Sequence, residues 1–199
     1  MKIKTPFNFL ALILIITFVS CDNLVVKKNP NAGKNDKLIA QADIPVEENK
    51  NLTINEILSF DIAFTQLNEI VKSSEFSEKF KGEKSFTVFA PLNGAFSKLP
   101  KGTLEDLKKE ENKESLAAIL NCHIIPGTIN EQDIIKAINE GGGSVKLRTL
   151  GGNKLIASRK RGKIYLIDKN GNAGRLMKTD IEATNGMIHT LETVMLPKK

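Results

Sequence analysis

The sequence predicts a domain of the α+β class, with helices in its first half and strand hairpins in its second half. Apolar residues between Ile54 and Val71 recur at roughly helical spacing, and residues 113–120 predict another helix. From Val145 onward, short apolar strands are separated by glycine-containing tight turns. Helices in one half of a domain and hairpins in the other half are the pattern of an α+β fold.

Three short elements are expected after the first helical region. Residues 85–90 are rich in Phe and Val and predict a strand that Pro91 ends. Asn93 is expected to cap the helical turn that follows, and Pro100 closes that turn. Residues 103–107 predict a short helix, because acidic residues in a first turn interact favourably with the helix dipole.

The second half is expected to open with a strand and a capped helix. A strand begins at His123 and stops at Pro126-Gly127. Asn130 then caps a helix over residues 131–139, and the run of glycines at 141–143 ends it.

The remaining strands are expected to be joined by tight turns, and the last strand to be half buried. The turns lie at Gly151-Gly152, Arg161-Gly162 and Asn170-Gly171. In the last strand apolar residues alternate with polar ones, which predicts one buried face and makes Ile188 a core residue. The alternating residues are Ile188, Thr190, Glu192, Val194 and Leu196.

Residues 1–20 have the features of an export signal. Lys2 and Lys4 precede an apolar run from Phe7 to Val19, and the small Ser20 stands directly before Cys21. This run is too short to span a bilayer, which takes roughly 20 residues. The arrangement resembles a bacterial lipoprotein signal, with cleavage before Cys21 and lipid such as palmitate added to its sulfur. An ordinary cleaved signal with an incidental cysteine is the alternative.

The rest of the chain divides into a tether and one domain. A lipid on Cys21 would anchor the chain to a membrane without the chain spanning it. Each CH₂ of an acyl chain that is buried in the membrane contributes about 0.8 kcal/mol to the free energy of binding. Residues 21–51 are polar and lack helical or strand periodicity, so we expect a flexible tether with a mean reach on the order of 30 Å. Residues 52–199 then form the folded domain. Cys122 is the only other cysteine, so the core has to be stable without an intramolecular disulfide.

The composition gives no sign of nucleic-acid binding. The formal net charge is +6, and ten Phe, one Tyr and no Trp form no pattern of interleaved basic and aromatic residues. The sequence contains no internal repeat, so a single monomeric domain is expected. We predict a protein of the cell envelope, with the cell surface or outer membrane favoured. The acidic Asp22 after the lipidated cysteine leaves a periplasm-facing position open.

Three stretches together resemble the signature segments of the fasciclin domain, an extracellular binding and adhesion module. They are Phe86-Thr-Val-Phe-Ala-Pro-Leu-Asn-Gly-Ala-Phe-Ser-Lys-Leu-Pro100, Leu116-Ala-Ala-Ile-Leu-Asn-Cys-His-Ile-Ile-Pro-Gly127 and Thr179-Asp-Ile-Glu-Ala-Thr-Asn-Gly-Met-Ile-His-Thr-Leu-Glu-Thr-Val-Met-Leu-Pro197. Their order and spacing cover most of the predicted domain. The resemblance implies a twisted two-sheet wedge or sandwich with helices packed alongside.

The two histidines lie in segments that carry this resemblance. Fasciclin domains have a tyrosine and a histidine at the position of Cys122-His123, and their second histidine corresponds to His189. Neighbouring side chains of a strand point to opposite faces, so His123 would be unable to activate Cys122. Two histidines without a carboxylate cluster also lack the three or four ligands of a zinc site. We therefore expect structural histidines, and no catalytic residue, metal or cofactor.

The resemblance also suggests residues that bind a partner. In matricellular fasciclin proteins an Asp-Ile pair and the Tyr-His pair are linked to integrin-mediated adhesion, which implies binding roles for His123, Asp180 and Ile181. The alternative is structural: Asp180 caps or bridges a turn, and Ile181 belongs to the core.

Two further segments carry charge at turns. Arg159, Lys160 and Arg161 form a basic cluster at a predicted hairpin tip, which would attract sulfated polysaccharide or anionic lipid headgroups. A solvated turn is the alternative. Residues 168–172 resemble the start of a calcium loop, but the twelfth position is Thr179 and not glutamate, so an Asn-Gly turn is the better interpretation.

These observations lead to two hypotheses for function. The first is a membrane-anchored extracytoplasmic lipoprotein whose fasciclin-like domain mediates cell adhesion or binds a protein, matrix or polysaccharide partner. The second is a receptor-like module of the envelope that holds a small apolar or lipid ligand between sheet and helices. An enzyme is not expected, because the sequence offers one free thiol, two separated histidines and no paired acids.

Overall fold

The computed structural model describes residues 51–74, 76–80 and 84–197, so the predicted signal peptide, Cys21 and nearly all of the predicted tether lie outside the described residues. The helices are α1 (Ile54–Phe60), α2 (Thr65–Lys72), α3 (Phe76–Lys79), α4 (Asn93–Phe96), α5 (Thr103–Leu107), α6 (Lys113–Cys122) and α7 (Glu131–Glu140), with 3₁₀ turns η2 (Ile62–Phe64) and η3 (Glu110–Asn112). The strands are β1 (Phe86–Pro91), β2 (Ile124–Pro126), β3 (Ser144–Arg148), β4 (Lys154–Lys160), β5 (Lys163–Ile167), β6 (Ala173–Arg175), β7 (Ile181–Ala183) and β8 (Gly186–Leu191).

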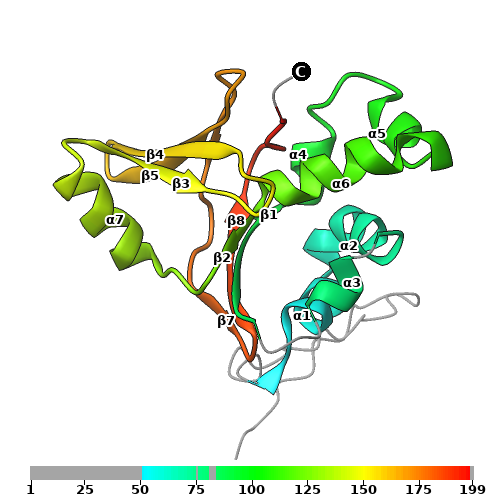
Figure 1. Ribbon diagram of the computed structural model, residues 1–199, viewed down its shortest axis with the longest axis horizontal. Helices are drawn as coiled ribbons and strands as arrows, with labels where there is room; N and C mark the ends of the chain where they lie inside the picture. Colours follow the sequence, from blue (N-terminus) through cyan, green and yellow to red (C-terminus); the bar gives the residue numbers. More distant parts are fainter. Residues whose placement is uncertain (1–50, 75, 81–83, 198–199) are drawn as a thin grey trace, which may run out of the picture. The chain divides into compact units, whose positions relative to one another are not determined.

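The strands of the described residues form two sheets of four, which confirms the predicted α+β class (Figure 1). One sheet has the order β2-β1-β8-β7, and the other is the meander β3-β4-β5-β6. Within the first sheet β1 and β8 run parallel, while every other neighbouring pair in both sheets is antiparallel. The predicted tight turns join the strands of the meander, as expected.

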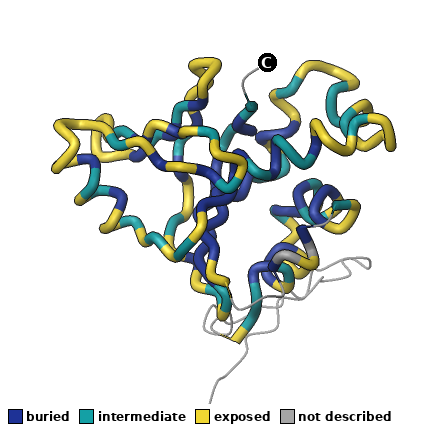
Figure 2. The backbone as a smooth tube through the Cα atoms, viewed as in Figure 1, coloured by how far each residue is buried: buried dark blue, intermediate teal, exposed yellow. Residues whose placement is uncertain are grey.

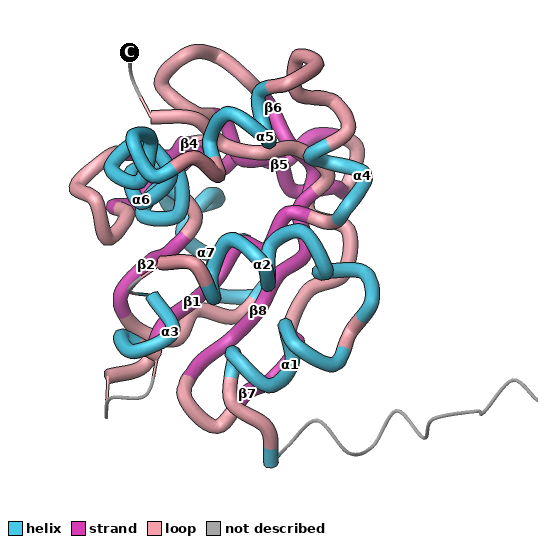
Figure 3. The backbone as a smooth tube through the Cα atoms, turned by 90° about the vertical axis from the view of Figure 1, so that its right-hand side faces the viewer, coloured by secondary structure: helices cyan, strands magenta, loops and turns pink. Residues whose placement is uncertain are grey.

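Two apolar clusters form the core of the described part of the chain. The first packs α1, α2, α3 and α6 against one face of β1 and β8. Figure 3 shows α1, α2 and α3 beside those strands. The second cluster joins α7 to the inner face of the β3-β4-β5-β6 sheet. The strands β1 and β8 contribute to both clusters, and in Figure 2 they form the dark blue centre of the described part of the chain.

The first helical region is divided at Asp61, which the periodicity alone did not indicate. Asp61 has extended backbone dihedrals and ends α1, and its carboxylate accepts a hydrogen bond of 2.9 Å from the Ala63 N–H to start η2. At the other end of α1, Thr53 and Glu56 form a reciprocal capping box. The region is helical as predicted, but as two helices with a 3₁₀ turn between them.

Asn93 caps a helix other than the predicted one. Leu92 is the residue that precedes α4, and no side chain of the described residues caps this helix. The Asn93 Oδ1 atom instead accepts from the Gln66 N–H at 3.1 Å, and its Nδ2 donates to the Ile62 carbonyl at 2.8 Å. Because these groups belong to the first turn of α2 and to η2, Asn93 caps α2 across a separation of 27 residues.

The prediction for the last strand is wrong in two respects, the burial of the strand and its length. β8 is buried at all six positions and ends at Leu191, so Val194 and Leu196 lie beyond it. Ile188 faces the first apolar cluster, whereas Leu191 belongs to the second. A strand that is covered on both faces does not need to alternate in polarity, and the polar Thr190 is accommodated through hydrogen bonds to the Lys178 backbone.

Candidate functional site

His123 lies in the interior at the junction of α6 and β2. It caps the C-terminus of α6 and is 2% exposed. Its Nδ1–H donates to the Ile119 carbonyl at 2.8 Å, and its Nε2 accepts from the Met195 N–H at 2.9 Å. An imidazole that donates at one nitrogen and accepts at the other is neutral. Burial lowers the pKa of His123 to about 4, which keeps the ring neutral at physiological pH.

Cys122 and His123 do not lie in one strand, which corrects the predicted geometry. Cys122 is the last residue of α6, and β2 begins only at Ile124. The Cys122 Sγ accepts from Asn153 Nδ2 at 3.3 Å, and burial raises the pKa of the thiol. A protonated, buried thiol is a poor nucleophile, so the arrangement gives no support to cysteine chemistry at this junction.

His189 is the second buried histidine and lies on β8. Its ring stacks on Phe89 with centroids 5.5 Å apart. Its Nε2–H donates to the Ile129 carbonyl at 2.8 Å, and its Nδ1 accepts from the Asp180 N–H at 3.2 Å. Burial lowers the pKa of His189 as well. Both histidines therefore have the structural, hydrogen-bonded arrangement that the sequence predicts.

Asp180 is exposed and joins β7 to α7. Its backbone is left-handed, with φ +57°, a conformation that Asp tolerates better than most residues do. Its Oδ1 accepts from the N–H of Glu131, the first residue of α7, at 2.8 Å, and lies 3.8 Å from His189 Nδ1. Asp180 therefore supplies a cap to a helix that begins 49 residues earlier in the chain.

The residues that the family resemblance implies do not share one surface. Asp180 is exposed, whereas Ile181 is 7% exposed and packs in the first apolar cluster. His123 is also buried. Burial keeps His123 and Ile181 from touching a partner in this conformation, so Asp180 is the member of this set that a partner can reach directly.

The buried histidines predict a loss of stability in acid. The unfolded state binds a proton to His123 near its ordinary pKa of 6.5, whereas the folded state does so only near 4. The contribution of neutral His123 to the free energy of unfolding is therefore fully present above pH 6.5. It falls by up to about 3 kcal/mol as the pH drops toward 4. Urea unfolding of the chain and of His123→Gln between neutral and acidic pH measures this contribution. A pH dependence that is equal in the two proteins would contradict it.

Asp168 organises the turn between β5 and β6 through four hydrogen bonds to its carboxylate. Its Oδ1 accepts from the backbone N–H groups of Asn170 at 2.8 Å and Asn172 at 2.9 Å. Its Oδ2 accepts from Asn172 Nδ2 at 2.9 Å and from the Leu196 N–H at 3.0 Å. The carboxylate is thus occupied by four donors, as the turn interpretation requires. In the part of the chain that the structure describes, no cluster of three or more His, Cys, Asp or Glu side chains is arranged to hold a metal ion.

The basic cluster lies at a hairpin tip, as predicted. Arg159 and Lys160 end β4, and Arg161 occupies the turn with φ +50°. All three side chains are exposed. The sequence interpretation missed Lys146 and Arg148, which lie on the neighbouring strand β3. Their alternation with Val145 and Leu147 is the signal that would have assigned them to one exposed face.

An apolar groove of about 770 Å³ lies elsewhere, between α5, α6 and the C-terminal segment. The apolar side chains that line it include Leu99, Pro100, Leu107, Ile119, Leu196 and Pro197. The second hypothesis expected a ligand between sheet and helices. This groove instead lies beside two helices and the turn that contains Asn170 and Asn172.

A family model for the fasciclin domain matches residues 63–197. The chain belongs to the fasciclin domain family. Protein sll1483 from Synechocystis sp. is 35% identical over 146 residues, which are 73% of this chain and 74% of that protein. Transforming growth factor-beta-induced protein ig-h3 from Sus scrofa is 34% identical over 145 residues, and the match covers 73% of this chain but 19% of that relative.

A solved structure shows the same fold. It is a FAS1 domain pair from the insect cell adhesion molecule fasciclin I, with a TM-score of 0.66 and 22% identity. The match covers 73% of this chain and 51% of that chain, so the fasciclin domain of this protein corresponds to about half of the pair. Among the described helices, none is long and apolar enough to cross a membrane.

Proposed function

We propose that this protein is a membrane-anchored extracytoplasmic lipoprotein whose fasciclin domain mediates cell adhesion or protein–protein binding. The fasciclin match over residues 63–197 carries this proposal. The insect relative of known structure is a cell adhesion molecule, which supports an adhesive role by analogy. Protein, matrix and polysaccharide are the partner classes that we propose.

The arrangement of the reactive groups supports a binding module and not an enzyme. His123 and His189 each hold two backbone groups, the Cys122 thiol is buried, and the Asp168 carboxylate is occupied by four donors. General acid–base catalysis needs a titratable group within reach of a substrate. These four groups are committed to the fold, so a partner would bind through the exposed surface.

The first test concerns the anchor. Cells that express the full chain are grown with an alkyne analogue of palmitate, and the purified protein is examined for incorporated label. We expect the wild-type chain to be labelled and Cys21→Ala to remain unlabelled. Protease accessibility on intact cells, with a periplasmic protein as the control, then distinguishes exposure at the cell surface from a periplasm-facing position. Equal labelling of both chains would overturn lipidation at Cys21.

The proposed contact at Asp180 can be tested with two variants that disturb the fold to different degrees. Asp180→Asn keeps an oxygen acceptor for the Glu131 N–H and tolerates the left-handed backbone, so it should cost less than about 1 kcal/mol. Asp180→Ala removes the cap and places Ala at φ +57°, which should cost about 1–3 kcal/mol. Thermal unfolding of both variants measures these losses.

Adhesion of cells to beads coated with each variant distinguishes a direct contact of Asp180 with a partner from an effect of Asp180 on the stability of the domain. If the Asp180 carboxylate touches a partner, both variants weaken adhesion by a similar factor. If only Asp180→Ala weakens it, the residue acts through the fold of the β7–α7 junction. Unchanged adhesion in both variants would remove Asp180 from the proposed binding surface.

The apolar groove supports the second candidate function, a receptor for a small apolar or lipid ligand. Its volume of about 770 Å³ and its mainly aliphatic lining suit a drug-sized apolar molecule. Ala118 lines the groove, so Ala118→Trp should fill part of it. Fluorescence titration with Nile red should give saturable binding to the wild type and weaker binding to Ala118→Trp. Equal titration curves would contradict a ligand site at the groove.

A further inference from the structure

The β3-β4-β5-β6 sheet has one covered and one open face. The helix α7 packs against β3 and β4, and Leu147, Leu155 and Leu166 point into the apolar cluster on that side. Figure 1 shows α7 beneath these strands, and among the described residues no helix lies on the opposite side of β4. Side chains that alternate with the buried leucines therefore lie on the open face.

Five cations share this open face, and we call them the cationic face. Arg148 lies directly opposite Lys154 in the ladder between β3 and β4, and Lys160 lies directly opposite Lys163 between β4 and β5. Lys146 lies opposite the outward-pointing Ile156. All five cationic side chains are exposed. Two of the three cations at the hairpin tip, Arg159 and Arg161, are not part of this face.

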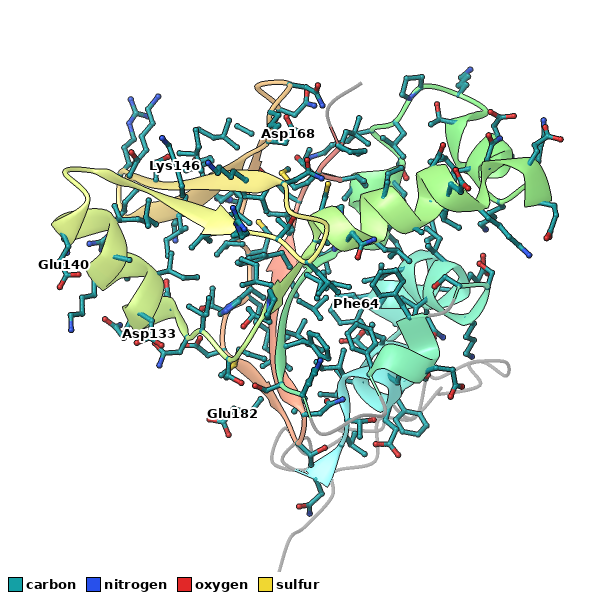
Figure 4. The ribbon with its side chains drawn as sticks, viewed as in Figure 1. Phe64, Asp133, Glu140, Lys146, Asp168 and Glu182 are labelled. Atoms are coloured by element: carbon teal, nitrogen blue, oxygen red, sulfur yellow. The ribbon has the colours of Figure 1, made fainter. Side chains whose placement is uncertain are left out.

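The charge of the chain is concentrated around this sheet. Residues 144–178 contain ten Lys and Arg but a single acid, the buried Asp168, so their formal charge is +9. The whole chain has a formal charge of +6, which leaves −3 for all other residues. Figure 4 shows Lys146 on the open side of the sheet, while Asp133 and Glu140 lie on α7 on the other side. The sheet face is thus positive and the helix behind it carries acids.

The cations are not neutralised within the described part of the chain. Like charges directly opposite each other in a ladder are destabilising, and the face has two such pairs, Arg148 with Lys154 and Lys160 with Lys163. The ion pairs between described residues involve Lys108, Lys109, Lys113, Arg175 and His189, and none of the five cations. An external anion would relieve this repulsion.

Apolar side chains occupy the centre of the same face. Ile156 is 37% exposed and lies opposite Ile167, and Tyr165 on the same strand as Ile167 is partly exposed. A soluble polyanion would use only the surrounding charges. A membrane surface would use both features, because Lys and Arg attract anionic headgroups while aliphatic and aromatic side chains enter the interface.

We propose that the cationic face docks the domain on an anionic lipid surface. The five cations lie against the phosphate groups, and Ile156 and Tyr165 face the boundary between headgroups and acyl chains. This contact would hold a lipid-anchored domain against its membrane, so it extends the proposed function. It does not depend on Cys21, because the cations and the apolar centre all belong to the folded sheet.

The test uses residues 21–199 with Cys21→Ser, so that no acyl chain contributes to binding. Cosedimentation is measured with vesicles of equal parts phosphatidylglycerol and phosphatidylcholine, and with phosphatidylcholine alone. We expect binding to the anionic vesicles that falls as salt rises. The double variant Lys154→Glu/Lys163→Glu should bind at least about thirtyfold more weakly, given about 1 kcal/mol for each cation near an anionic surface.

The matched control is Lys101→Glu/Lys136→Glu, which changes the net charge equally at exposed residues outside the cationic face. It should retain most of the vesicle affinity. Ile156→Ser should weaken vesicle binding severalfold but leave binding to dextran sulfate unchanged. Equal losses in the two double variants would overturn the proposal, as would binding to dextran sulfate without binding to anionic vesicles. A failure of palmitate labelling would refute the anchor and leave these results unaffected.

Discussion

The variant Gly186→Ala is expected to lose a large part of the stability of the domain. Gly186 begins β8 with φ +151° and lies opposite Phe86 in the parallel pair of β1 and β8. An added Cβ would lie 1.9 Å from the Phe86 carbonyl oxygen and 2.9 Å from its backbone nitrogen. The obstacle is backbone in the centre of the sheet, so no side chain can rotate away.

The expected loss is about 4 kcal/mol or more. Overpacking in a core costs about 1–3 kcal/mol and occasionally more, and a strained backbone conformation adds about 1–3 kcal/mol. Domains of this size are stable by only about 5–15 kcal/mol. Urea unfolding followed by circular dichroism should show a much lower midpoint, or no folded baseline.

Gly94→Ala is the matched control for this substitution. Gly94 lies in α4, and an added Cβ there would meet no atom within 4 Å. Alanine is a better helix former than glycine, so a gain of about 0.5–1 kcal/mol is expected. If Gly186→Ala retained the wild-type midpoint, the close approach of β8 to β1 would be contradicted.

The parts of the fold that the sequence predicted depend on local signals. Asn130 caps α7 through a capping box with Asp133, three residues away. The turn at Asn170-Gly171 is held by Asp168, which lies within the same loop. Helix caps and tight turns need only a few neighbouring residues, so a single sequence contains the information that specifies them.

The parts that the sequence did not predict depend on contacts between distant segments. The prediction that Asn93 caps the helix after it is wrong, because the Gln66 N–H from which Asn93 accepts lies 27 residues earlier in the chain. The sequence alone underestimates the burial of β8, because its parallel partner β1 lies about one hundred residues earlier in the chain. Covering on both faces is a property of the assembled sheet, and periodicity within one strand cannot reveal it.

In the candidate site, too, the sequence predicts features that depend on neighbouring residues and does not predict those that depend on distant segments. The basic hairpin tip was visible in the sequence because its three cations are consecutive. The cationic face was not visible in the sequence, because its residues are brought together only by the register of β3, β4 and β5. In the same way, the contact of Asp180 with the first residue of α7 spans 49 residues.

Ile188→Ala is expected to have the second-largest effect. Ile188 is 0% exposed and lies on β8 between Val88 of β1 and Ile181 of β7. The helices of the first apolar cluster cover this position, so the neighbouring residues can collapse only partly into the space left by the lost methyl and methylene groups. Large-to-small substitutions of this kind cost about 2–5 kcal/mol.

The same substitution at Ile156 distinguishes two causes of a loss of stability, the loss of buried contacts and the lower β-propensity of alanine. Both residues are isoleucines in central strands, but Ile156 is 37% exposed and points away from the core. Ile156→Ala removes the same atoms at little cost in packing, so a loss of about 1 kcal/mol or less is expected. Urea unfolding of the two variants should therefore differ clearly in midpoint. Equal losses would mean that β-propensity and not burial on β8 determines the stability, and the two-sided burial of β8 would have to be reconsidered.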